Sequence, residues 1–139
     1  MGAVVVPSVS QSSVSERKWA RVHNKAHKAG MAALAKVRPA PIVVQKSLGL
    51  SSVPDPRAKQ YVSSEGLCGF AWVEVSGRSG YGRWAKASGV GRHSEYFRCV
   101  MVHCHEGGQS FERKSAYVAA FAGVLAEAGV EAHVMSRMD

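Results

Sequence analysis

The sequence predicts an α+β fold: a small, mainly antiparallel sheet of three or four strands with two helices packed on it, preceded by a basic amphipathic N-terminal helix. Apolar residues recur at helical spacing near both ends of the chain, and short apolar runs bounded by glycine lie between and after them. The length of 139 residues suits one domain of this kind.

The first helix is predicted over residues 14–37. Ser13 and Glu16 have the spacing of a capping box, in which both side chains satisfy free backbone N–H groups at a helix start. Pro39 disfavours helical geometry in the residue before it, so we expect the helix to end there. Gly30 lies inside the helix, where it allows a kink or a break into two helices.

The chain is expected to divide into four segments. Residues 1–13 form a flexible tail, residues 14–38 the basic helix, residues 39–66 a short strand and a linker loop, and residues 67–139 a compact α+β core. The short strand is predicted at residues 41–44. The core strands are predicted at residues 67–75, 95–105 and 130–135, and the core helices at residues 81–88 and 110–128, with Ser110 and Gly89 as caps.

The net charge of +8 comes entirely from the N-terminal part of the chain. Residues 1–60 hold 10 Lys and Arg against 2 Asp and Glu, whereas residues 61–139 hold 8 of each sign. Six basic side chains of the first helix share an arc of roughly 100°. They are Arg17, Lys18, Arg21, Lys25, Lys28 and Lys36. A neighbouring arc of small residues, with Trp19 as its large member, is left to pack on the rest of the protein.

A basic segment joined to a neutral body favours a polyanionic partner. We therefore expect a non-enzymatic accessory protein that binds nucleic acid, DNA or RNA, through these six residues together with Arg83 and Lys86. The alternative is a protein-interaction module in which the same helix docks on the acidic surface of a host or virion protein.

Aromatic and basic residues also occur together in the core segment. They are Phe70, Trp72, Tyr81, Trp84, Tyr96 and Phe97, with Arg83, Lys86, Arg92 and Arg98. Aromatic rings beside arginine can stack on unpaired bases, but in a small domain such rings more often form the core. Both interpretations remain open from the sequence.

A glycine-rich turn at residues 77–84 joins a predicted strand to a predicted helix, where free N–H groups favour an anion. Gly77 and Gly82 have the glycine spacing of a P-loop, but Arg83 and Trp84 follow where that motif needs Lys and then Ser or Thr. We expect an ordinary glycine turn or a passive phosphate contact, and not a nucleotide-hydrolysis site.

Two groups of residues carry metal-ligating atoms. Four of them lie in one predicted strand: Cys99, His103, Cys104 and His105. Because strand neighbours point to opposite faces, at most half of this group can converge. His23 and His27 share a helix face, but Asn24 stands where zinc proteases place a catalytic Glu, so a surface pair is expected.

No serine or cysteine has the surroundings of a nucleophile, and we expect no metal, no cofactor and no catalysis.

The chain contains 3 cysteines, and it has neither a recognisable signal peptide nor an apolar run of the roughly 18 residues that a membrane span needs. An odd number of cysteines without an export signal argues against a disulfide framework. We expect an intracellular protein with free thiols and no membrane partner.

Several segments carry a resemblance to known chains. They are residues 29–33, residues 68–73, residues 108–110 with 112–114, and residues 135–139. With these segments the chain resembles small uncharacterised proteins of tailed bacteriophages, which have no known activity or catalytic residue to carry over. The resemblance implies a protein that acts in the cytoplasm of an infected bacterial host or in the virion.

Overall fold

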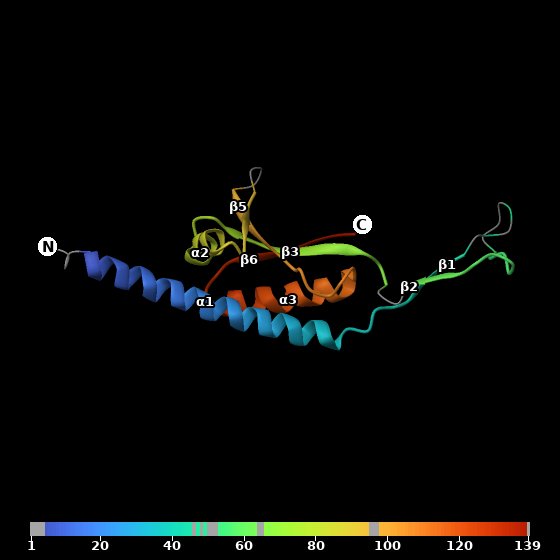
Figure 1. Ribbon diagram of the computed structural model, residues 1–139, viewed down its shortest axis with the longest axis horizontal. Helices are drawn as coiled ribbons and strands as arrows, with labels where there is room; N and C mark the ends of the chain where they lie inside the picture. The colour runs from blue at the N-terminus through green and yellow to red at the C-terminus, as the bar shows by residue number, and fades with distance from the viewer. Residues whose placement is uncertain are drawn as a thin grey trace.

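The computed structural model has the predicted α+β class, and it describes residues 5–45, 47, 49, 53–63, 66–94 and 98–138. This part of the chain contains three helices and two sheets (Figure 1). In chain order the elements are α1 (Val5–Lys36), β1 (Ile42–Val44), β2 (Tyr61–Ser63), β3 (Gly69–Ser76), α2 (Gly80–Ser88), β4 (Arg92–His93), β5 (Cys99–His103), α3 (Phe111–Glu127) and β6 (Ala132–Met138).

The main sheet is antiparallel throughout, with strand order β4-β5-β3-β6. Val73 of the central strand β3 pairs with Val102 of β5 on one side and with Val134 of β6 on the other. Alternate residues of β3 from Gly69 to Val75 are buried, while those between them are half-buried or exposed. One face of the sheet therefore belongs to the core, and we call the other the open face.

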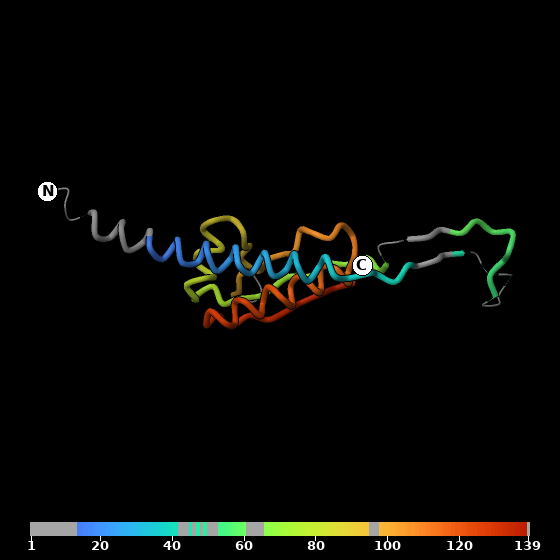
Figure 2. The backbone as a smooth tube through the Cα atoms, turned by 90° about the horizontal axis from the view of Figure 1, so that it is seen from below, coloured from blue at the N-terminus to red at the C-terminus, as the bar shows by residue number. Residues whose placement is uncertain are grey.

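Helix α3 covers the core face of the sheet, where it contacts β3 and β6. Helix α1 lies beside α3 and runs in the opposite direction, and α2 contacts α1, β3 and β5 (Figures 1 and 2). Buried hydrophobic residues from these elements form one cluster, which includes Ala26, Val73, Val75, Tyr81, Ala85, Val100, Val102, Val118, Phe121 and Leu125. All three helices thus contribute to a single core.

The predicted caps of the two core helices are confirmed. Ser110 precedes α3, and its hydroxyl accepts a hydrogen bond of 3.2 Å from the backbone N–H of Arg113. Gly89 ends α2 with a φ of 87°, the left-handed conformation that glycine adopts without steric cost. Both helices therefore start and stop close to where the sequence predicts.

Helix α1 begins earlier than predicted, at Val5. Ser13 therefore lies inside the helix, and the capping-box interpretation is wrong. Pro7 does not prevent the early start, because the first turn of a helix makes no use of the N–H group that proline lacks. Residues 5–13 are helical and not a tail, while residues 1–4 lie outside the described residues.

Gly30 does not break α1, which continues as one helix to Lys36, close to the end that Pro39 predicts. The glycine is buried where α1 meets α3, and a Cβ atom at this position would lie 2.6 Å from the ring of Tyr117. A residue without a side chain lets the two helices approach closely. This contact explains why a glycine is placed where it costs about 1 kcal/mol of helix stability relative to Ala.

The β1 strand confirms the strand expected at residues 41–44, but the sequence does not predict its partner β2. Ile42 pairs with Ser63 in an antiparallel register. Among the described elements these two strands contact only each other, so they form an arm that projects from the body (Figure 1). Part of the predicted linker loop lies outside the described residues. The final strand β6 starts and ends later than predicted.

Candidate nucleic-acid interface

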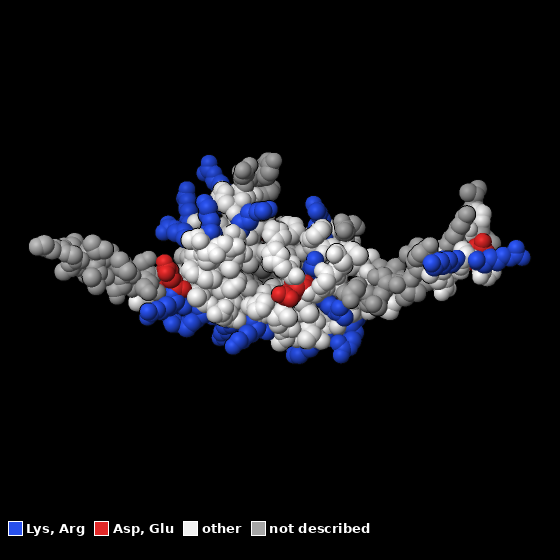
Figure 3. All heavy atoms as spheres, in the orientation of Figure 1, with Lys and Arg blue, Asp and Glu red and all other residues white. Residues whose placement is uncertain are grey.

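The six basic residues of α1 that are predicted to bind nucleic acid are all exposed. We call this set the basic stripe: Arg17, Lys18, Arg21, Lys25, Lys28 and Lys36. Ala26 and Gly30 are buried on the inner side of the helix, and Trp19 packs there against the core. At 1.5 Å per residue the stripe is roughly 28 Å long. Figure 3 shows Lys and Arg side chains along the side of the molecule that α1 occupies.

Two histidine–tyrosine hydrogen bonds hold the inner side of α1. Nδ1 of His23 lies 2.8 Å from the hydroxyl of Tyr81 in α2, and Nδ1 of His27 lies 2.5 Å from the hydroxyl of Tyr117 in α3. The expectation of a surface histidine pair is wrong, because both rings are half-buried between helices. Burial, and to a smaller extent His27, lowers the pKa of His23 and keeps its ring neutral at pH 7. These bonds fix which side of α1 faces outward.

Arg83 lies close to the start of the basic stripe. Helix α2 packs on α1 at Gly80, where a Cβ atom would lie 2.7 Å from the indole of Trp19. Trp19, Arg83 and Trp84 line a cleft of about 680 Å³ between the two helices. Lys86 is exposed on α2 and does not line this cleft. The structure thus brings Arg83 beside α1 but leaves Lys86 outside the cleft.

The glycine-rich turn before α2 serves capping and packing. The hydroxyl of Ser79 accepts a hydrogen bond of 2.9 Å from the backbone N–H of Gly82. A Cβ atom on Gly82 would lie 2.1 Å from the carbonyl oxygen of Ser76, so only glycine fits there. Of the two interpretations of this turn, these contacts support an ordinary glycine turn.

The aromatic residues of the core segment are divided between two places. Tyr81 is fully buried in the core, and Trp84 is half-buried near α1. Phe70 and Trp72 instead lie on the open face of the sheet. The two other rings belong to residues 95–97, which lie outside the described residues. The described aromatic residues therefore do not form one stacking surface.

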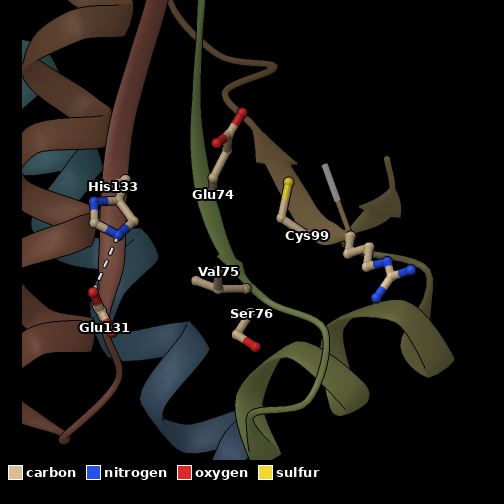
Figure 4. Close-up of a pocket in the computed structure, with 7 residues that line it drawn as sticks. Glu74, Val75, Ser76, Cys99, Glu131 and His133 are labelled. Atoms are coloured by element: carbon tan, nitrogen blue, oxygen red, sulfur yellow. Dashed lines mark ion pairs between the residues drawn. The ribbon is translucent and has the colours of Figure 1, made fainter. Parts of the chain in front are cut away.

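Cys99 lines a pocket of about 360 Å³ with Glu74, Glu131 and His133 (Figure 4). Nε2 of His133 lies 3.3 Å from the carboxylate of Glu131, and both side chains are exposed. Burial and the Glu74 carboxylate raise the pKa of the Cys99 thiol. A cysteine nucleophile or metal ligand must be a thiolate, a form that burial and the Glu74 carboxylate disfavour for Cys99.

Of the strand residues considered as metal ligands, His103, Cys104 and His105 line one cleft, whereas Cys99 lines another. The ring of His103 stacks on Trp72 of the open face, with the ring centroids 5.5 Å apart. The thiol of Cys104 is buried in the core, where it donates to the carbonyl oxygen of Glu106 at 3.4 Å. Within the described part of the chain, no three His, Cys, Asp or Glu side chains lie close enough to hold a metal ion.

Sequence reasoning misses one charged residue of the core, Lys114 in α3, which is 6 % exposed. Tyr117, Val118 and Phe121 follow it by three, four and seven residues, so Lys114 stands in the middle of the apolar arc of the helix. That position is the signal that could reveal it. A lysine at the centre of an apolar arc must either extend to solvent or be buried with the arc.

Comparisons with protein-family models, curated proteins and solved structures find no match to this chain. Among the described residues, no helix combines the length and the apolar character that crossing a membrane requires.

Proposed function

We propose that this protein binds nucleic acid without catalysis, through contacts between the basic stripe and backbone phosphates. The observation that carries the proposal is the exposure of all six cations on a helix whose inner side is buried. Because the core fixes α1, the cations keep a constant line along the surface. Glu16 is the one acidic residue that α1 contains, so little charge on the helix opposes a polyanion.

The length of the stripe suits a duplex backbone. Roughly 28 Å corresponds to about eight base pairs, at 3.4 Å per nucleotide of one strand. Phosphate contacts position a protein without reading sequence, so the proposed binding is non-specific and includes DNA and RNA. Trp19, Arg83 and Trp84 line the adjoining cleft, which Glu16 lines as well, so the cleft extends this surface with two aromatic side chains but little net charge.

The proposal includes a setting. The resemblance to small proteins of tailed bacteriophages supports a place in the cytoplasm of an infected bacterium or in the virion. Both contain nucleic acid at high concentration.

Fluorescence anisotropy with labelled duplex DNA, single-stranded DNA and RNA across a salt series tests the proposal. The triple variant Arg21→Gln/Lys25→Gln/Lys28→Gln should bind roughly tenfold or more weakly at low salt, and its log–log salt slope should fall by about 0.9 for each phosphate that is no longer neutralised. The matched control, Arg21→Lys/Lys25→Arg/Lys28→Arg, keeps the charge and should bind like the wild type. Absence of binding by the wild type at low salt would rule the proposal out.

An acidic protein surface is the second candidate partner, because the basic stripe would attract it as well. Capture of tagged protein from a bacterial lysate, with and without nuclease, separates the two. A partner that nuclease removes supports nucleic acid. A partner that survives nuclease but does not bind the triple glutamine variant supports protein docking.

A further inference from the structure

Lys114 is the only buried Lys, Arg, Asp or Glu among the described residues. Within that part of the chain its ammonium has no hydrogen bond and no carboxylate within 4.0 Å. Its Nζ lies 5.2 Å from the centroid of the Phe70 ring. Most of this side chain is buried, but its Nζ reaches solvent, so the ammonium is open to an anion from outside the protein. No described carboxylate occupies that position.

Lys114, in the first turn of α3, lines a cleft of about 690 Å³ together with residues from β4 and the end of β5. Arg92, His103 and His105 line the same cleft. None of the described residues that line it is acidic, and the nearby Glu106 is exposed and lies outside the lining. Two cations and two imidazole rings thus share one cavity without a balancing carboxylate.

The imidazole ring of His103 responds to this excess of positive charge. Burial lowers the pKa of His103, and the neighbouring His105 and Arg92 lower it further. The same positive potential that disfavours a proton on His103 attracts an anion into the cleft.

The cleft has an apolar wall as well. Phe70 is 39 % exposed, and its ring lies between Lys114 and Arg137, whose Cζ is 5.5 Å from the ring centroid. A volume of about 690 Å³ is within the range of roughly 300–1,000 Å³ that small-molecule sites occupy. There is room for an organic group beside an anionic one.

We propose that this cleft binds a phosphate monoester, whose oxygens accept hydrogen bonds from Lys114 and Arg92 while its organic group packs on the Phe70 ring. A phosphate provides the anionic partner that is missing beside the Lys114 ammonium. An arginine can bind two oxygens of one phosphate at once. The ring nitrogens of His103 and His105 supply further donors. The site uses residues other than the basic stripe, so it does not depend on the proposed nucleic-acid binding. The phosphate can belong to a free nucleotide or to the end of a nucleic-acid strand.

Isothermal titration calorimetry with four probes tests the site: inorganic phosphate, adenosine 5′-monophosphate, a 5′-phosphorylated trinucleotide and its unphosphorylated twin. The wild type should bind the phosphorylated probes, and Lys114→Met should bind them at least roughly tenfold more weakly. Lys59→Met is the matched control, because it removes the same charge from an exposed lysine outside the cleft and the basic stripe, and it should leave phosphate binding unchanged. Preference for the mononucleotide or for the phosphorylated trinucleotide distinguishes the two sources.

Thermal unfolding distinguishes a ligand site from a purely structural lysine. Lys114→Met keeps an apolar chain of similar length and removes an ammonium that makes no ion pair, so its Tm without ligand should be close to that of the wild type. Phosphate should raise the Tm of the wild type and of Lys59→Met, but not that of Lys114→Met. If millimolar phosphate leaves the wild-type Tm unchanged, or raises the Tm of Lys114→Met equally, the proposal is overturned.

Discussion

The basic stripe and the cleft around Lys114 both present cations, but the two regions hold them in different states. The stripe residues are exposed and hydrated, so each gains little from a single ion pair and many must act together. Lys114 is mostly buried and shares a cleft with Arg92 and two histidines, so one small anion can contact several donors at once. Burial, and not the net charge of +8, therefore decides which region suits a long polyanion and which suits one small anion.

Neutralising the whole basic stripe should produce the largest difference between nucleic-acid binding by the stripe and phosphate binding by the cleft. With all six stripe residues replaced by Gln, affinity for nucleic acid should fall by about a hundredfold or more at low salt, because phosphates without a protein cation keep their condensed counterions. Phosphate binding in the cleft should be unchanged. Anisotropy and calorimetry on the same protein measure both. If phosphate binding disappears too, the two regions are not independent.

The packing of α1 on α3 holds the stripe in place, and Gly30→Ala should weaken it. The added Cβ would meet the Tyr117 ring, so the free energy of unfolding should fall by roughly 1–3 kcal/mol. Gly123→Ala in α3 is the matched control, because open space surrounds that position, and it should raise the free energy of unfolding by up to about 1 kcal/mol. Urea denaturation measures both. Equal gains from the two substitutions would contradict the close helix contact.

Acid should loosen the packing of α1 on α2 and α3 through His23. Burial and His27 lower the pKa of His23 in the folded protein, and the ring otherwise faces Tyr81, Trp84 and Phe121. As the pH falls below about 6.5, the unfolded chain takes up a proton that the folded protein resists, so stability declines by at most about 1.4 kcal/mol per pH unit for this group.

His23→Gln should therefore show a shallower loss of stability between about pH 7.5 and pH 5.5, measured by urea denaturation at each pH. Part of the loss should remain, because the pKa of His103 is lowered as well. An unchanged pH dependence in His23→Gln would assign the effect to other groups.

Salt should distinguish the two regions, and its effect on phosphate affinity in the cleft should be the smallest of the predicted effects. Raising the ionic strength to a physiological level should reduce nucleic-acid affinity by orders of magnitude, but phosphate affinity in the partly buried cleft by less than about tenfold. Calorimetry at two salt concentrations measures the second value. A parallel steep loss would place the phosphate on the stripe.

Local signals in the sequence were sufficient for the core helices and the central strand. Ser110 and Gly89 act on their own backbone neighbours, so both caps could be predicted from single residues. The apolar run that predicted β3, with the glycines after it, likewise lies within one segment of the chain. The start of α1 and the short β2 strand had no such signal, because β2 exists through its pairing with β1 and has only 3 residues.

The candidate sites divide in the same way. The arc of the basic stripe follows from the geometry of one helix, so it could be read from spacing alone. The burial of His23 depends on Tyr81, which is 58 residues away. The cleft around Lys114 depends on residues from β4, β5 and α3. Tertiary contacts between segments that are distant in the chain produce no periodic pattern in the sequence.

The projecting arm has a consequence for hydrogen exchange. Strands β1 and β2 contact no other described helix or strand, and a two-stranded hairpin without further packing is only marginally stable in water. Deuterium should therefore replace the amide protons of the arm long before it reaches those of β3, which is bonded on both sides. We therefore expect local unfolding of the arm to be frequent and independent of the body, in which local unfolding is rare.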